Sequence, residues 1–327
     1  MITLFELQDA LILGLFWGIM ALGVYITFRI LDFPDLTVEG SFVFGAALAA
    51  RLITSGFDPV LSTLLAMLAG IIAGLITGFF HTVLKIPKLL SGILTMFGLY
   101  SINLRAMGGL PNIPVQPVWP GSDVTVMSRM ADLFATVASW FGAEIEFTAR
   151  DASPSILVGI LFVIAVIAAL RIFFNTEVGY ALRATGDNEP MVKAQGVNTN
   201  KMKVFGLMIG NSCAAIAGAL IAQVTFVADV NMGAGIIVIG LAAVIIGEVI
   251  FRDKNNYRCF VAVVLGSIIY RIIIAFVLRY GNPQDFQLRT AVMIALALSI
   301  PMLRDKLNIR LKKSAILGES GKKGGDE

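Results

Sequence analysis

The sequence predicts an all-α integral membrane protein, and three observations lead to this fold class. Of its 327 residues, 57% are hydrophobic and only 14% are charged, whereas about a quarter of the residues in soluble domains are charged. The mean hydropathy is +0.85. Apolar runs of about 20 residues, long enough to cross a bilayer as helices, recur along most of the chain. We therefore expect a bundle of about 8–10 membrane-spanning helices.

The predicted helices follow the apolar runs in chain order. They cover residues 7–28, 36–53, 60–80, 88–107, 154–174, 202–224, 234–250, 257–278 and 286–303. The count stays open by about one helix on either side, because the second or the seventh run could be broken or re-entrant. We take residues 1–303 as one transmembrane domain, with a connector at 108–153, and residues 304–327 as a basic tail.

The basic residues indicate how the helices are oriented, because loops on the cytoplasmic side of a membrane carry an excess of lysine and arginine. If the N-terminus is outside and the C-terminus is cytoplasmic, all eleven lysines fall on the cytoplasmic side. The opposite orientation would place every one of them outside. The net charge of +3 then reflects these loops and not a surface that binds nucleic acid.

Residues 175–197, NTEVGYALRATGDNEPMVKAQGV, form a polar segment between two apolar runs. Residues that cap helices stand where two short helices would begin and end: Asn175 or Thr176, then Gly186, then Asp187 or Asn188, and finally Gly196. One alternative is a loop that lies on the membrane surface, but the charges are mixed, which is poor for binding anionic lipid. Capped helices of mixed charge between two spans are better suited to docking in a groove of a partner protein.

The polar segment resembles the coupling segment of permeases for branched-chain amino acids, ribose-type sugars and nucleosides in ATP-binding-cassette (ABC) importers. The residues that match in order and spacing are Gly179, Arg183, Gly186, Asp187, Asn188, Glu189 and Gly196. The following stretches, KMKVFGLMIGNSCAAIAGAL and IGLAAVIIGEVIF, resemble the next two helices of the family. The stretch DFPDLTVEGSFVFGA most resembles permeases of tryptophan/tyrosine import systems. The fold that this resemblance implies is the type II-like ABC importer permease architecture.

The resemblance also implies partners. The matched residues would dock on an ABC ATPase subunit, and two copies of the chain, or this chain and a sister permease, would pair around one path. A separate extracytoplasmic substrate-binding protein would deliver a small organic solute, with an aromatic or branched-chain amino acid first and a nucleoside or sugar as the alternative. The expected location is the bacterial cytoplasmic membrane.

The chain itself is expected to be a transport subunit and not an enzyme. It has no G-x-x-x-x-G-K-[ST] phosphate loop, so ATP and Mg²⁺ would be bound by the partner ATPase, and we expect no cofactor in this chain. Its single histidine, His81, has no neighbouring cysteine or histidine in the sequence that would suggest a metal site.

Three carboxylates, Asp32, Asp35 and Glu39, surround the start of the second predicted helix. Asp35 can cap that helix, and carboxylates in a first turn suit the helix dipole. Glu39 lies a turn deeper, where an ionisable side chain is costly and often faces a cavity. We expect Glu39 to line the translocation path, with Asp35 as a further candidate. The same carboxylates support an alternative from another class, an ion-coupled secondary transporter that needs no ATPase.

Asn211 and Ser212 lie midway along the predicted helix 202–224 and are the other candidates for the path. Hydrogen bonding between helices is the first interpretation of these two side chains, and lining the path is the second. Small residues at four-residue spacing in 60–80 and 202–224 predict close packing of these helices with their neighbours. In the connector, residues 127–141 predict a short amphipathic helix.

Overall fold

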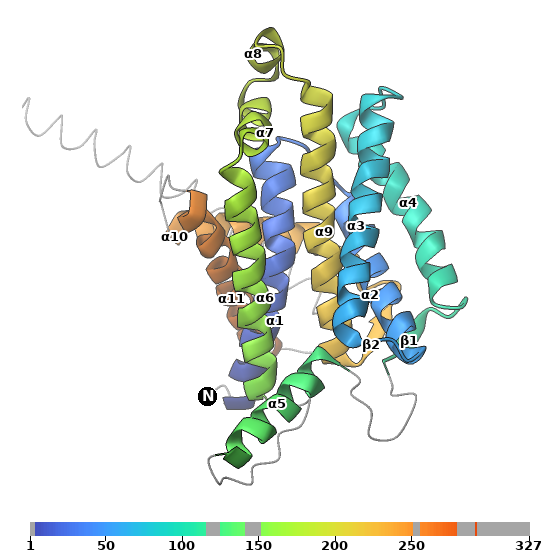
Figure 1. Cartoon of the computed structure of the whole chain (residues 1–327), viewed down its shortest axis with the longest axis vertical. Coiled ribbons are helices and arrows are strands. Elements are labelled where there is room, and N and C mark those ends of the chain that lie inside the picture. The colour runs from blue at the N-terminus through green and yellow to red at the C-terminus, as the bar shows by residue number, and fades with distance from the viewer. Residues whose placement is uncertain (1–3, 116–124, 141–151, 251–255, 280–291, 293–327) are drawn as a thin grey trace, which may run out of the picture. The chain divides into compact units, whose positions relative to one another are not determined.

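The computed structural model describes residues 4–115, 125–140, 152–250, 256–279 and 292. Within these ranges the chain is mainly helical (Figure 1). Seven helices in the described part are long and apolar enough to cross a membrane: Phe5–Ile30, Thr37–Thr54, Pro59–Thr82, Lys88–Ala106, Ala152–Phe174, Thr199–Thr225 and Arg258–Phe276. This confirms the all-α membrane class. Apart from residue 292, the predicted helix 286–303 lies outside the described residues, and so does the basic tail.

The secondary structure follows the predicted order. The helices are α1 (Leu4–Val24), α2 (Thr37–Thr54), α3 (Pro59–Thr82), α4 (Lys88–Ala106), α5 (Val126–Trp140), α6 (Ala152–Phe174), α7 (Glu177–Asp187), α8 (Glu189–Ala194), α9 (Thr199–Thr225), α10 (Ile236–Ile250) and α11 (Asn256–Arg279). A π-helical stretch, η1 (Tyr25–Ile30), continues α1, and two strands are β1 (Asn112–Pro114) and β2 (Val227–Asp229). The chain divides into two compact units, Met1–Phe276 and Val277–Glu327, and the description below concerns the first.

Helix α9 stands between α1 and α3 in the bundle (Figure 1). Gly70 and Gly74 of α3 lie so close to α9 that an added Cβ would overlap its backbone carbonyls. The glycines of α9 face other neighbours, since Gly210 packs on Thr27 and Gly218 on the Phe42 carbonyl. The predicted close packing is therefore present, because small residues let several helices approach α9 at once.

The two ends of the bundle differ in what covers them (Figure 1). One end carries α7 and α8, and the other carries α5 and a pair of antiparallel strands in which Ile113 faces Ala228. These strands were not predicted from the sequence, because three residues each are too short to show a period-two pattern. The amphipathic helix predicted in the connector is α5, whose first amide, Val126 N–H, donates to Gln223 Oε1 of α9 at 2.9 Å.

Helix α2 begins inside the bundle and not at its end. After η1 the backbone turns at Asp32, which has a φ of 52°, and Phe33 N–H bonds back to the Thr27 carbonyl at 2.8 Å. The residues that follow meet α9 at Asn211, twelve residues beyond the Thr199 start of that helix. At 1.5 Å per residue this is about 18 Å along the helix axis. The carboxylates near the start of α2 are therefore brought deep into the protein.

Candidate functional site

A set of buried polar side chains joins α2, α3, α4 and α9, and we call it the polar cluster: Asp35, Thr37, Ser41, Thr77, Thr95 and Asn211. Asp35 accepts from Thr37 N–H at 2.9 Å and from Asn211 Nδ2 at 2.7 Å. Asn211 Oδ1 in turn accepts from Ser41 at 2.6 Å. The hydroxyls of Thr37 and Thr77 lie 2.7 Å apart, and Thr77 donates to Thr95 at 2.9 Å.

The polar cluster is closed, because its side chains bond to one another and are at most 4% exposed. Burial raises the pKa of the Asp35 carboxyl, and the hydrogen bonds from Thr37 and Asn211 oppose that shift. Asp35 also bonds the first amide of α2, which is the capping role considered for it. Asp35 and Asn211 therefore hold helices together, and neither lines the cavity described next. The Ser212 hydroxyl donates to the Ile209 carbonyl of its own helix at 2.7 Å, and Ser212 does not line this cavity either.

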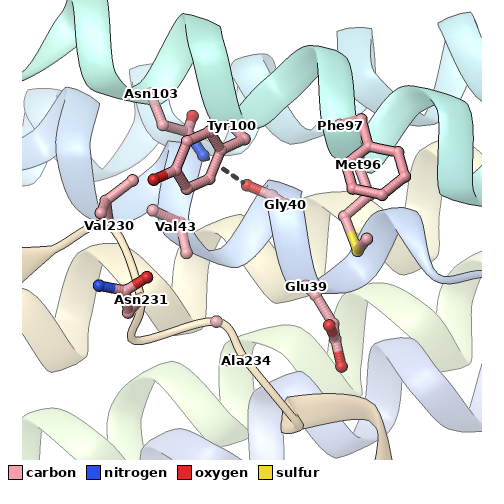
Figure 2. A pocket seen from close by; sticks show the side chains of 11 residues that line it. Glu39, Gly40, Val43, Met96, Phe97, Tyr100, Asn103, Val230, Asn231 and Ala234 are labelled. Atoms are coloured by element: carbon pink, nitrogen blue, oxygen red, sulfur yellow. Dashed lines mark hydrogen bonds between the residues drawn. The ribbon is translucent and has the colours of Figure 1, made fainter.

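A cavity of about 420 Å³ lies beside the polar cluster, between α2, α4 and the turn that precedes α10. Its volume falls within the range of small-molecule sites, roughly 300–1,000 Å³. The residues that line it are Glu39, Gly40, Val43, Met96, Phe97, Tyr100, Asn103, Val230, Asn231, Gly233 and Ala234. Figure 2 shows side chains from both helices and from the turn around this pocket. We call it the α2–α4 pocket.

Glu39 is the carboxylate that the structure places in the α2–α4 pocket. One oxygen, Oε1, accepts from Gly235 N–H at 3.1 Å, and the amide of Ile237 also donates to this carboxylate. Glu39 thus caps the start of α10 while its side chain remains half-buried against the cavity. Glu39 therefore lines a cavity, and its predicted place on a translocation path stays a prediction.

Asn103, a further polar residue that lines the pocket, was not predicted as a site residue from the sequence. Asn103 is 1% exposed, and its Nδ2 donates to the Gly40 carbonyl at 3.1 Å. Its Oδ1 is buried and has no hydrogen-bond partner among the described residues. An asparagine inside a membrane helix was a signal in the sequence, but its orientation toward Glu39's helix could not be known before α2 and α4 were placed together.

The polar segment 175–197 forms two short helices as predicted, α7 and α8. Thr176 caps α7 by accepting from Gly179 N–H at 3.2 Å, and Asn188 caps α8 by accepting from Met191 N–H at 3.1 Å. Gly196 follows α8 with a φ of 84°, a left-handed conformation that glycine adopts without strain. Local capping chemistry therefore predicted these helices correctly.

Gly186 does not end α7, contrary to the prediction. The helix continues to Asp187, and Gly186 packs so tightly on η1 that an added Cβ would overlap the Ile30 carbonyl oxygen. Gly179 is buried in the same way against the Phe173 carbonyl at the end of α6. Both glycines of α7 are thus explained by close approach to the membrane helices, which sequence spacing alone did not reveal.

Arg183 turns inward from α7. Its Nη2 donates to the Phe174 carbonyl at the end of α6, and its guanidinium lies 5.1 Å from the centre of the Phe174 ring and 5.2 Å from that of Tyr180. The arginine satisfies a carbonyl left free at a helix end and stacks on two aromatic faces. It fixes α7 to α6, while Asp187 beside it is exposed.

Glu189 attaches α8 to the start of α9. Its carboxylate accepts from Lys203 at 2.8 Å and from Thr199 at 3.0 Å, and it pairs with Lys193 at 2.9 Å. Partial burial raises the pKa of Glu189, but the hydrogen bonds from Lys203, Lys193 and Thr199 outweigh burial and lower this pKa to about 2. The polar segment 175–197 is therefore hydrogen-bonded to α9 and α6 and packed on η1.

The three carboxylates near α2 have separate partners. Asp32 pairs with Lys88 at 3.4 Å, Asp35 belongs to the closed cluster, and Glu39 caps α10. They do not form a continuous chain of titratable groups, which is the arrangement that a proton relay through a membrane would need.

These features define the class of the protein. A bundle of apolar helices with a capped polar segment packed on one end and a carboxylate-bearing pocket between its helices is a helical membrane permease. Residues 7–301 match the family described as branched-chain amino acid transport system / permease component, and the chain belongs to this family.

Individual relatives agree with this placement. The chain is 41% identical to the tyrosine transport system permease protein of Clostridioides difficile over 92% of both chains. It is 34% identical to an uncharacterized protein of Rickettsia prowazekii, over 86% of this chain and 92% of that one. It is 25% identical to a ribose import permease protein of Haemophilus influenzae, over 77% of this chain and 69% of that one. No solved structure matches the chain.

Proposed function

We propose that this chain forms the membrane path of an ATP-driven importer for an amino acid with an aromatic or branched side chain. In this proposal α7 and α8 dock on a cytoplasmic ABC ATPase, which binds the ATP and Mg²⁺, and a separate binding protein delivers the solute at the other end. The N-terminus is then outside and the C-terminus cytoplasmic, in a bacterial cytoplasmic membrane.

The attachment of α7 and α8 to three membrane helices is the observation that carries the proposal. Gly186 lies against η1, Arg183 against the end of α6, and Glu189 against the start of α9. A force applied to α7 and α8 would reach all three through short contacts. A loop that only lay on the membrane surface would not need these buried contacts.

The exposed side of α7 and α8 supports docking on a protein. Tyr180 is 59% exposed and Met191 is 47% exposed, on a segment that also exposes Asp187 and Lys193. Exposed apolar side chains among charges of both signs suit a protein groove, where aromatic residues and methionine are enriched.

A second permease copy is proposed on the open side of the α2–α4 pocket. Phe97 and Tyr100 are 65% and 50% exposed there, and half-buried Glu39 lies beside them within a membrane-spanning helix. A carboxylate at this depth is costly if hydrocarbon reaches it, and such groups face a protein or water-filled interior. Pairing of two chains over this side would enclose a shared path.

The amino-acid assignment is supported by the 41% identical relative described as a tyrosine transport system permease protein, and a sugar or nucleoside is the alternative. ATP-dependent uptake of labelled tyrosine into vesicles that hold the complete system, with ribose, nucleosides and other amino acids as competitors, separates these solutes. Uptake that needs an ion gradient and no ATP would instead support the secondary transporter.

Docking is tested by purification from native membranes in mild detergent, followed by mass spectrometry of whatever accompanies the chain. We expect an ABC ATPase to accompany the wild-type chain and to be lost on Met191→Glu. The matched control is Leu133→Glu on α5, because Leu133 is 59% exposed at the other end of the bundle. An ATPase that stays with the Met191→Glu chain, or that never accompanies the wild type, would contradict the docking proposal.

A further inference from the structure

The α2–α4 pocket carries information about the chemistry of its ligand, beyond its place in a permease. Its lining residues, all within the described ranges, include one carboxylate, Glu39, and no lysine, arginine or histidine. A single negative charge in a pocket of low polarity favours a cation and opposes an anion.

The carboxylate is available to a ligand even though it caps α10. The hydrogen-bond donors to the Glu39 carboxylate are backbone amides, Gly235 N–H at 3.1 Å and Ile237 N–H, and no basic side chain neutralises it among the described residues. A carboxylate has two oxygens and about four acceptor positions, so two amides leave room for further donors. A ligand ammonium can therefore add a charge-assisted hydrogen bond.

The wall of the pocket is apolar and aromatic on the α4 side. Met96 and Phe97 of α4 each lie about one turn from Tyr100 of the same helix, and Val43 of α2 also lines the pocket. Flat apolar faces of this kind pack against an aromatic or branched side chain, and aromatic rings also attract a nearby cation.

A second acceptor, Asn103 Oδ1, belongs to a residue at the other side of the pocket. In Figure 2 Glu39 and Asn103 lie at opposite ends of the lining residues, with Met96, Phe97 and Tyr100 along α4. Asn103 is 1% exposed, and its Oδ1 has no partner in the described part of the chain. A buried acceptor without a donor is costly, so a ligand that supplies a donor there would gain from satisfying it.

We propose that the α2–α4 pocket binds an amphipathic primary amine, with its ammonium at Glu39, its apolar or aromatic body on Met96, Phe97 and Tyr100, and a hydrogen-bond donor at Asn103 Oδ1. Tyrosine has all three groups, and so does tyramine, which lacks the carboxylate. This inference deepens the proposed function by naming the chemistry of its solute, and it rests on that function only for the assumption that the solute reaches the pocket.

The experiment measures binding of four probes to the purified full chain in lipid nanodiscs by equilibrium dialysis: tyrosine, tyramine, 3-(4-hydroxyphenyl)propionate and phenethylamine. We expect tyramine to bind at least as tightly as tyrosine. Loss of the ammonium in the propionate should weaken binding at least about tenfold, the value of one charge-assisted hydrogen bond. Loss of the hydroxyl in phenethylamine should weaken binding about three- to tenfold, the value of one neutral hydrogen bond.

Two variants assign these effects to residues. Glu39→Gln keeps an oxygen that can accept from Gly235 N–H and removes the charge, so tyramine should bind at least about tenfold more weakly while α10 stays capped. Asn103→Leu should abolish the difference between tyramine and phenethylamine. The control is Glu248→Gln, which removes a carboxylate on α10. Glu248 pairs with Arg29 and does not line the pocket, so this variant should leave the affinity for tyramine unchanged.

Equal binding of tyramine and the propionate, an unchanged affinity in Glu39→Gln, or no saturable binding of tyramine would each overturn the inference. ATP-dependent uptake of tyrosine in vesicles is measured in parallel. Uptake without probe binding to the pocket would reject the pocket assignment and leave the importer standing. Selective probe binding without ATP-dependent uptake would reject the importer and leave the amine site standing.

Discussion

Asp35 and Glu39 are carboxylates four residues apart at the start of the same helix, and the structure gives them opposite surroundings. Asp35 is 0% exposed and is held by Thr37 and Asn211 within the closed polar cluster. Glu39 is half-buried, bonds backbone amides of α10 and faces a cavity of about 420 Å³. The first has its partners inside the protein, and the second has room for one from outside.

This difference shows that depth in a membrane protein does not by itself indicate function. A buried polar group whose hydrogen bonds are all made by the protein fixes one arrangement of helices. A polar group beside a cavity retains capacity for a ligand. The polar cluster is therefore expected to control stability and the α2–α4 pocket to control binding, and the following substitutions test that division, from the largest expected effect on stability to the smallest.

Asp35→Ala should have the largest effect on stability. It leaves Thr37 N–H and one N–H of Asn211 Nδ2, whose other N–H donates to Leu207, without an acceptor in a fully buried place, at about 1–3 kcal/mol for each unsatisfied group. The measurement is unfolding of the purified chain as sodium dodecyl sulfate is added to dodecylmaltoside micelles. The double substitution Asp35→Asn with Asn211→Asp restores a complementary pair and should recover part of the loss. A stability like that of the wild type in Asp35→Ala would mean that the cluster does not hold the helices.

Gly218→Ala tests the packing that keeps α2 against α9. An added Cβ would overlap the Phe42 carbonyl oxygen, so the two helices must separate, at a cost of about 1–3 kcal/mol. The matched control is Gly98→Ala in α4, where an added Cβ meets nothing within 4 Å. The same unfolding assay compares the two, and an equal effect of both substitutions would contradict the packing argument.

Glu189 is a third carboxylate, outside the membrane spans, and it extends the comparison to pH. Because its folded pKa is lowered to about 2, its bonds to Lys203 and Lys193 stabilise the fold above the ordinary glutamate pKa and are lost as the pH falls toward 2. We expect Glu189→Gln to cost about 0.5–1 kcal/mol at pH 7. The difference in melting temperature between wild type and variant should shrink between pH 5 and about pH 3. A difference in melting temperature that grew as the pH fell would contradict the lowered pKa of Glu189.

Glu39→Gln should have the smallest effect on stability, below about 0.5 kcal/mol, because glutamine keeps an acceptor for Gly235 N–H. The same variant is expected to lose amine binding, so its two measurements separate capping from ligand recognition. If Glu39→Gln destabilised the chain as much as Asp35→Ala, the contrast between the two carboxylates would fail, and Glu39 would be a structural cap of α10.

Membrane spans and helix caps could be predicted from the sequence, because each depends on residues close together in the chain. Apolar runs of bilayer length identified the seven candidate spans in the described part of the chain, because each helix must satisfy its own backbone hydrogen bonds in lipid. The run predicted at 234–250 forms the shorter helix α10, which is not among these spans. Thr176, Asn188 and Gly196 marked the ends of α7 and α8, because a cap acts on amides within a few residues. Asn188 and Gly196 also belong to the residues on which the family resemblance rested.

The tertiary structure alone decided what each polar side chain meets. The sequence did not distinguish Asp35 from Glu39 by partner, did not place Arg183 on Phe174, and did not bring Asn103 to the backbone of Gly40. These contacts join residues on different helices, so they depend on how α9 and its glycines draw the helices together. Sequence determined which helices form, because propensity and capping are local; packing determined which carboxylate is sealed among other side chains and which one faces a cavity.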